Sequence, residues 1–447
     1  MYNELTNGRS VGIMRKRQSF QMTLLAVTLG LWTILLIFVT TKHDVHKSKR
    51  STDPLVLSSQ ESNQCQAKRI LLWTEFWKSQ SLGWEKIFYR QIARECPSHQ
   101  CELVYDHRFL ESADAVIFHP IDLLPDYNMP EVHRTGQPWV FFSLEAPPAV
   151  EEDQKVNLTG LGGIFNWTMT YRQDSDIVVP YGRIVPKMGI NPTNAQGKLT
   201  NTTGRDYWSG KNPNMLVAWM VSHCATTSRR EWFVKEMVKY IRVDVFGRCG
   251  FKKCGKNISF KTLGSFDQDK CNEEIEQYMF YFAFENAICR DYVTEKFFMA
   301  LQQNVVPVVF GGTNYAAIAP PNSFINALDF PSPKALSEYL KMVAGNATMY
   351  NKYLEWKDLY TVELGHPFSP MICDLCHRLH HPEKYQEYVP RSAASRAGVS
   401  LGVVGRDSAS GSYPNIHSWF VKGSACRTWW SGHWDHRKHK DLYQNHD

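Results

Sequence analysis

Apolar runs of strand length alternate with helix-like segments along most of this 447-residue chain. In the second half, MLVAWMVS and VDVFG have the composition of buried strands, and TSRREWFVKEMVKYI between them has the spacing of an amphipathic helix. The same alternation of helix and strand recurs further on, where the helix-like segment VTEKFFMALQQ precedes the strand-like VVPVVFGG. Such alternation predicts parallel sheets with crossover helices, and hence an α/β protein.

The first half shows the same alternation, with the short apolar runs ILLWTEFW, AVIFHP and PWVFFSLEAPP. We expect two such halves with a cleft between them, at 67–200 and 211–360, joined by the Asn-, Thr- and Gly-rich segment 191–211, which is a linker or a long surface loop. Residues 361–447 form the predicted C-terminal tail. Its stretch SAASRAGVSLGVVGRDSASGS predicts flexibility, and its aromatic run WFVKGSACRTWWSGHW predicts packing against the body.

Residues 18–41 contain no charged side chain and are long enough to cross a hydrocarbon core of about 30 Å as a helix. This pattern predicts a transmembrane signal anchor, preceded by a cytoplasmic tail at 1–17 and followed by a polar stem at 42–66. A cleaved signal peptide is the competing interpretation, although its apolar region is normally about 7–15 residues long.

Basic residues flank the span on both sides, so charge does not fix its orientation. The glycosylation sequons all follow it, at Asn157, Asn166, Asn201, Asn257 and Asn346. The 11 cysteines are expected mostly to pair in an oxidising compartment, and their odd number leaves at least one free or bonded to another chain. We therefore expect a lumenal body; which cysteines pair is left open.

Side chains at three places in the sequence are suited to ligand binding or catalysis. Glu295 and Lys296 begin a predicted helix after a strand, where a lysine can neutralise phosphate and a carboxylate can accept from sugar hydroxyls; a surface ion pair is the alternative. Arg230, beside Arg229, can clamp a pyrophosphate or be a solvated helix arginine. Glu145 follows an apolar strand, where partial burial would raise its pKa and suit it to general-base work; a surface turn acid is the alternative.

Longer strings around these residues resemble the α1,3-fucosyltransferase family, from about residue 139 to about residue 330. The matching strings are GQPWVFFSLEAPP, FNWTMTYRQDSDIVVPYG, VDVFGRCG, YFAFENAICRDYVTEKFFMALQQNVVPVVFGG and PPNSFINALDF. The resemblance implies a GT-B fold, in which two Rossmann-like domains face a cleft. It also implies an inverting, GDP-fucose-dependent enzyme of the Golgi membrane, single-pass type II. It implies Glu145 as the general base. The implied donor contacts are Arg230, Asn286, Tyr292, Glu295 and Lys296.

The resemblance implies no obligatory metal, with a divalent ion at most stimulatory. The net charge of +6 suits an anionic nucleotide and requires no nucleic-acid partner. One departure is Ser222-His223, where the family usually has Ser-Asn, and it leaves open whether Arg229 or Arg230 contacts the donor.

The expected acceptor is a GlcNAc-containing glycan. The segment VDVFGRCGFKKC and the long tail resemble core-type enzymes that modify the innermost GlcNAc of N-glycans. A Lewis-type acceptor, N-acetyllactosamine, stays open, as do another nucleotide-sugar donor and a non-catalytic glycan-binding protein.

The motif Cys373-Asp-Leu-Cys376-His377 can indicate zinc, a redox pair or a structural disulfide. With one such motif in an oxidising lumen, a structural disulfide is favoured over zinc or redox chemistry, and Cys373 and Cys376 are the disulfide candidates. Similar cysteine pairs occur in the family.

Overall fold

A computed structural model of the chain describes residues 67–76, 101–123, 128–192, 199, 202–252, 268–364, 369–384 and 411–430. The predicted cytoplasmic tail, anchor and stem, the sequons at Asn201 and Asn257, and most of the segment expected to be flexible lie outside these ranges. Within them, no helix has the length and apolar character needed to span a membrane.

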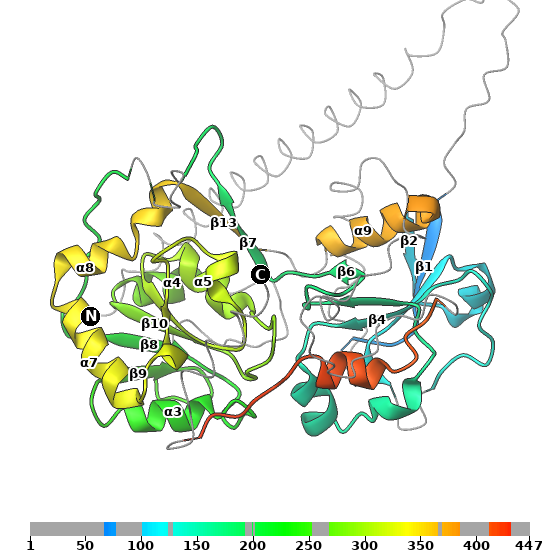
Figure 1. Cartoon of the computed structure of the whole chain (residues 1–447), viewed down its shortest axis with the longest axis horizontal. Coiled ribbons are helices and arrows are strands. Elements are labelled where there is room, and N and C mark those ends of the chain that lie inside the picture. Colours follow the sequence, from blue (N-terminus) through cyan, green and yellow to red (C-terminus); the bar gives the residue numbers. More distant parts are fainter. Residues whose placement is uncertain are drawn as a thin grey trace, which may run out of the picture. The chain divides into compact units, whose positions relative to one another are not determined.

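The first half contains a parallel six-stranded sheet in the order β2-β1-β3-β4-β5-β6 (Figure 1). Its strands are β1 (Lys68–Leu72), β2 (Cys101–Val104), β3 (Ala115–Phe118), β4 (Trp139–Ser143), β5 (Trp167–Thr170) and β6 (Ile177–Val178). The middle strands β3 and β4 are buried at every position, as the continuous apolar runs of a parallel sheet require.

The second half contains a parallel five-stranded sheet in the order β12-β11-β10-β8-β9. Its strands are β8 (Val217–Met220), β9 (Val243–Phe246), β10 (Phe280–Phe284), β11 (Val306–Phe310) and β12 (Ile325–Asn326). The helices are α3 (Arg230–Met237), α4 (Gln268–Glu276), α5 (Glu295–Gln302), α6 (Tyr315–Ile318), α7 (Pro333–Ala344) and α8 (Ala347–Lys352). These two parallel sheets confirm the α/β prediction; the exact limits of the domains stay a prediction.

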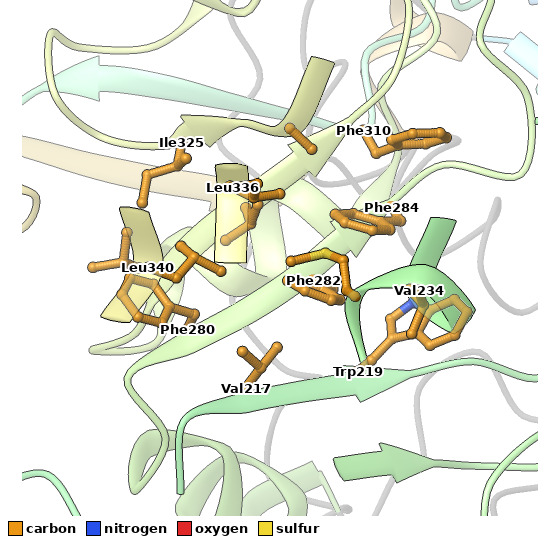
Figure 2. Packing of buried hydrophobic residues seen from close by; sticks show 14 of the residues in the cluster. Val217, Trp219, Val234, Phe280, Phe282, Phe284, Phe310, Ile325, Leu336 and Leu340 are labelled. Atoms are coloured by element: carbon orange, nitrogen blue, oxygen red, sulfur yellow. The ribbon is translucent and has the colours of Figure 1, made fainter. Parts of the chain in front are cut away.

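The core of the second half lies on both faces of its sheet. On one face, alternate residues of β10 pack with α3 and α7, and Figure 2 shows Phe280, Phe282 and Phe284 beside Leu336 and Leu340. The residues between them, Tyr281 and Ala283, belong to the cluster on the other face. Because side chains alternate along a strand, β10 is apolar throughout and anchored rigidly up to its carboxyl end.

Three C-terminal elements pack back onto the body. β13 (Tyr360–Leu364) pairs antiparallel with β7 (Gly182–Pro186). Helix α9 (Ser369–His380) covers the first sheet through Ile372, Leu375 and Leu379 (Figure 1). Residues 411–430, here called the C-terminal strap, include a single helical turn at Ser418–Lys422 whose Trp419 and Phe420 are buried. For the part of the aromatic run that the structure describes, 419–430, the expected packing against the body is confirmed.

Candidate active site

Glu145 is the second residue after β4, at the carboxyl end of a parallel sheet, where ligands of α/β proteins bind. The turn is held by Ser143 Oγ, which donates to the Glu145 carbonyl at 3.0 Å, and by Tyr181 Oη, which donates to the Leu144 carbonyl at 2.8 Å. Burial raises the pKa of the Glu145 carboxyl, and the positive charge of Lys296 and a hydrogen bond to the carboxylate oppose that rise. The group is thus a stronger base than an exposed glutamate.

The hydrogen bond comes from the other half of the chain. Tyr292 Oη donates to Glu145 Oε2 at 3.1 Å, across 147 residues of sequence. The Tyr292 ring packs edge-on against Tyr171, which follows β5, with 4.9 Å between the ring centroids. Burial raises the pKa of the Tyr292 phenol well above its ordinary value. The Tyr292 phenol is therefore neutral. Its hydrogen bond connects the predicted base to the segment that is predicted to bind the nucleotide sugar.

Lys296 lies in the first turn of α5 within a cluster of acceptors. Its Nζ atom is 3.1 Å from Glu295 Oε1 and 3.4 Å from Glu285 Oε2, and it donates to Thr294 Oγ1 at 2.8 Å. Burial alone would lower the pKa of the Lys296 ammonium, but the two carboxylates outweigh burial and raise it. Lys296 is thus a permanent cation at a helix N-terminus, suited to a phosphate.

Glu285 and Thr294 belong to this cluster, although the sequence patterns did not single them out. Glu285 directly follows β10 and is completely buried. Its Oε1 accepts from the Thr294 backbone N–H at 2.8 Å, and Thr294 Oγ1 lies 2.9 Å from its Oε2. Glu285 could have been noticed in the sequence as a single acid at the end of the apolar run YFAFEN. A carboxylate buried at such a position needs a cation or several hydrogen-bond donors nearby.

Arg230 and Asn286 each present a buried polar atom toward which no described group is directed. Arg230 is 3% exposed, and its guanidinium donates to the Phe284 carbonyl at 2.5 Å and to the His223 carbonyl at 3.2 Å. Its Nε and Asn286 Oδ1 have no hydrogen-bond partner among the described residues. Since buried polar groups are nearly always paired, a ligand is the simplest partner for both.

The neighbouring Arg229 is directed elsewhere. Its guanidinium lies over the exposed Trp430 ring, 3.2 Å from the ring centroid, and its backbone is left-handed with φ 58°. The geometry favours Arg230 as the ligand contact. The departure at His223 leaves this geometry intact, because His223 contributes its backbone carbonyl, which any residue would supply.

The sequons differ in exposure. Asn157 and Asn346 are exposed and cap short helical turns through their Oδ1 atoms. Asn166 is half-buried, its Nδ2 donates to the Gly411 carbonyl at 3.4 Å, and Thr168 of the same sequon is completely buried. Which sequons carry glycans stays a prediction.

The prediction that Cys373 and Cys376 take part in disulfides is confirmed. Cys376 bonds Cys101 at the start of β2, so the two cysteines of the motif are not bonded to each other. The physical reason is that side chains three residues apart on a helix are separated by about 5–6 Å between Cβ atoms, whereas a disulfide needs about 3.8 Å. The sulfur atoms of Cys101 and Cys376 lie within 4.8 Å of a His380 ring nitrogen, but being bonded to each other they are not the thiolates that zinc binds.

Comparisons with known proteins agree with the two-half organisation. The model "Fucosyltransferase, N-terminal" matches residues 65–182, and "Glycosyltransferase family 10 (fucosyltransferase) C-term" matches residues 209–393. The chain therefore belongs to glycosyltransferase family 10, the fucosyltransferases, and is a glycosyltransferase enzyme.

Two Drosophila melanogaster proteins are among its relatives. Alpha-(1,3)-fucosyltransferase C is 35% identical over 395 residues, which are 84% of this chain and 87% of that protein. Glycoprotein 3-alpha-L-fucosyltransferase A is 33% identical over 299 residues, 65% of this chain and 54% of that protein. A crystal structure of an alpha1,3-fucosyltransferase with GDP-fucose is 16% identical, with a TM-score of 0.40, and covers 69% of this chain and 84% of that one.

Proposed function

We propose that this enzyme transfers L-fucose from GDP-fucose, in α1,3 linkage and with inversion, to a GlcNAc residue of a glycoprotein glycan. The observation that carries the proposal is the half-buried Glu145 carboxylate, which accepts a hydrogen bond from Tyr292, four residues before the cation Lys296. A hydrogen bond to Tyr292 thus connects a base of raised pKa to the short segment of chain that carries a phosphate-binding cation. The family membership and the α1,3-fucosyltransferase relatives support the same reaction.

In the proposed reaction, the acceptor 3-hydroxyl attacks the anomeric carbon of fucose from the side opposite GDP. The new C–O bond forms as the bond between that carbon and the β-phosphate oxygen breaks, and the bonding electrons leave with GDP. Glu145 removes the hydroxyl proton during attack. The configuration of the anomeric carbon is inverted because the acceptor oxygen bonds to the face opposite the departing GDP in a single displacement.

The leaving phosphate gains negative charge, which Lys296 and Arg230 stabilise together with the N-terminus of α5. Asn286, Tyr292 and Glu295 are the further proposed donor contacts. Since these side chains supply positive charge and donors without a metal, we expect transfer to continue in EDTA, with a divalent ion at most stimulatory. The proposed GT-B arrangement assigns Glu145 to the acceptor half and the cations to the donor half.

For the acceptor we propose the innermost GlcNAc of N-glycans. The cysteine-rich segment after β9 and the long C-terminal tail, which resemble core-type enzymes, support this choice. One cysteine of that segment, Cys249, bonds Cys224 in the loop before Arg230.

We also propose a Golgi location, with residues 18–41 as a type II anchor and the catalytic body lumenal. Disulfides at Cys101–Cys376, Cys224–Cys249 and Cys289–Cys426 support an oxidising compartment.

The test uses the full chain produced in a eukaryotic secretory host, with GDP-fucose, EDTA and two acceptors, a core-exposed N-glycopeptide and N-acetyllactosamine. Mass and linkage analysis should find α1,3-fucose on the innermost GlcNAc of the glycopeptide. Transfer to N-acetyllactosamine alone would replace the core acceptor with a Lewis-type one. Turnover with GDP-mannose or a UDP-sugar but not GDP-fucose would overturn the donor, and no GDP release with any acceptor would overturn the reaction.

A further inference from the structure

The C-terminal strap contacts both loops that carry the proposed donor-binding residues. Residues 226–230 lead into α3 and carry Arg230, and residues 285–292 follow β10 and carry Asn286 and Tyr292. The family model ends at residue 393, so the strap lies beyond the region by which the family is recognised.

The contact with the second of these loops is covalent and hydrogen-bonded. Cys426 forms a disulfide with Cys289, between Asn286 and Tyr292. On either side of it, Arg427 N donates to the Ile288 carbonyl and Arg290 N donates to the Ser424 carbonyl, both at 2.8 Å. The strap thus fixes the backbone of this loop at three consecutive residues.

The contact with the first loop follows directly along the strap. Trp429 N donates to the Ser228 carbonyl at 3.3 Å, and the buried Trp429 ring packs against Phe233 of α3. Trp430 lies under the Arg229 guanidinium. The two loops are also joined to each other, since Ser228 N donates to the Asn286 carbonyl at 3.0 Å and Ser228 Oγ donates to the Glu285 carbonyl at 2.9 Å.

The other end of the strap is fixed to the first sheet. Tyr413 Oη donates to Asp176 at 2.9 Å, and the completely buried Arg172 donates to the Trp419 carbonyl and lies over the Trp419 ring. Arg172 also pairs with Asp174, which accepts from Arg290 at 2.7 Å. One segment therefore holds the 285–292 loop against the half that carries Glu145.

We propose that the C-terminal strap is a positioning element of the active site, in which the Cys289–Cys426 disulfide and Trp430 hold the two loops that present Arg230, Asn286 and Tyr292 to a nucleoside diphosphate sugar. This inference rests on the proposed function. The strap would then affect catalysis although its residues are not among the proposed substrate contacts.

The test compares two double variants of the full chain, Cys289→Ser/Cys426→Ser and Cys101→Ser/Cys376→Ser. The disulfides close loops of 137 and 275 residues. Loop length enters the chain entropy only logarithmically, so both variants are expected to lose similar thermal stability. Only the first releases the 285–292 loop.

At a temperature where circular dichroism shows both variants folded, kcat/KM for GDP-fucose should fall on the order of 10- to 100-fold in Cys289→Ser/Cys426→Ser. The acceptor KM should not change, and the GDP Kd from calorimetry should rise. The Cys101→Ser/Cys376→Ser control should keep wild-type donor parameters. Equal donor parameters in the two variants would overturn the inference and reduce the strap to a stabilising role.

A milder pair of variants decides the matter if the first double variant does not fold. Trp430 and Trp232 are 51% and 53% exposed, and each lies beneath a cation, Arg229 and Lys235 respectively. Trp430→Ala should weaken GDP binding about threefold, the loss of one exposed cation–π contact, and Trp232→Ala should not. No difference between them would contradict the inference. A wild-type chain that neither binds GDP nor transfers fucose would instead overturn the proposed function, and the inference with it.

Discussion

Glu145 and Glu285 occupy equivalent places in the two halves, yet their surroundings assign them opposite tasks. Each follows the apolar strand of a parallel sheet, and burial raises the pKa of both carboxyls. Glu285 is surrounded by donors, with the Thr294 backbone N–H at 2.8 Å and the Lys296 ammonium at 3.4 Å. Glu145 accepts one described side-chain hydrogen bond, from Tyr292.

The difference shows what a buried carboxylate needs in order to act as a base. The Thr294 donors and the Lys296 charge stabilise the ionised form of Glu285, so Glu285 acts as the counter-ion of Lys296. A carboxylate with unused acceptor capacity and a raised pKa can take a proton from a bound hydroxyl. The account therefore predicts that loss of Glu145 affects chemistry, whereas loss of Glu285 affects the fold.

The largest expected effect is on turnover in Glu145→Gln. The amide keeps the shape and can still accept from Tyr292, but it cannot take the acceptor proton, so kcat should fall roughly 10²- to 10⁴-fold. GDP affinity and the melting temperature should not decrease, because the substitution removes the charge of a half-buried carboxylate. Steady-state kinetics, calorimetry and thermal unfolding check this. Near-normal turnover would remove the contrast with Glu285.

Glu285→Ala should mainly destabilise the protein. The substitution removes the carboxylate that accepts from the Thr294 N–H and pairs with the Lys296 ammonium. The free energy of unfolding should therefore fall by about 3 kcal/mol. Denaturant titration measures it. The control is Glu338→Ala, which removes the exposed Glu338–Lys334 pair at 3.8 Å and should cost well under about 1 kcal/mol. Equal losses would show that burial adds nothing to the Glu285 pair.

Thr294→Val tests the hydroxyl within the same cluster. It removes an acceptor of Lys296 and a donor to Glu285 but keeps the backbone N–H, so about 1 kcal/mol of stability should be lost. Thr294→Ser keeps the hydroxyl and should recover most of that loss. If the serine variant is no more stable than the valine variant, the hydroxyl contributes nothing and Glu285 relies on the backbone and Lys296 alone.

The sheets could be predicted from sequence because their information is local. The runs FYFAF and VPVVF become β10 and β11, since a strand covered on both faces buries consecutive side chains and both runs are short and bounded by polar residues. Glu295 and Lys296 at a helix start after a strand were likewise readable, since the helix pattern and the strand fix their place.

Contacts between distant parts of the chain could not be read. Tyr292 and Glu145 are 147 residues apart, and Cys101 and Cys376 are 275 apart, so no local pattern connects either pair. Glu285 was passed over because its partner Lys296 lies eleven positions later, across a loop whose path the sequence does not specify. The surroundings of Arg229 and Arg230 could not be distinguished for the same reason, because Trp430, which lies under Arg229, comes from the far end of the chain.

The pH dependence of kcat/KM tests the central claim, that Glu145 is a base set by burial and by Tyr292, most directly. A raised pKa means that the carboxyl becomes protonated, and activity is lost, as pH falls through a value above the ordinary 4.5. Tyr292→Phe removes a hydrogen bond to the charged form, so this acid limb should move to higher pH. In Glu145→Gln, the residual activity should have no such limb. An acid limb that stays in place in Glu145→Gln, or that moves to lower pH in Tyr292→Phe, would contradict the account.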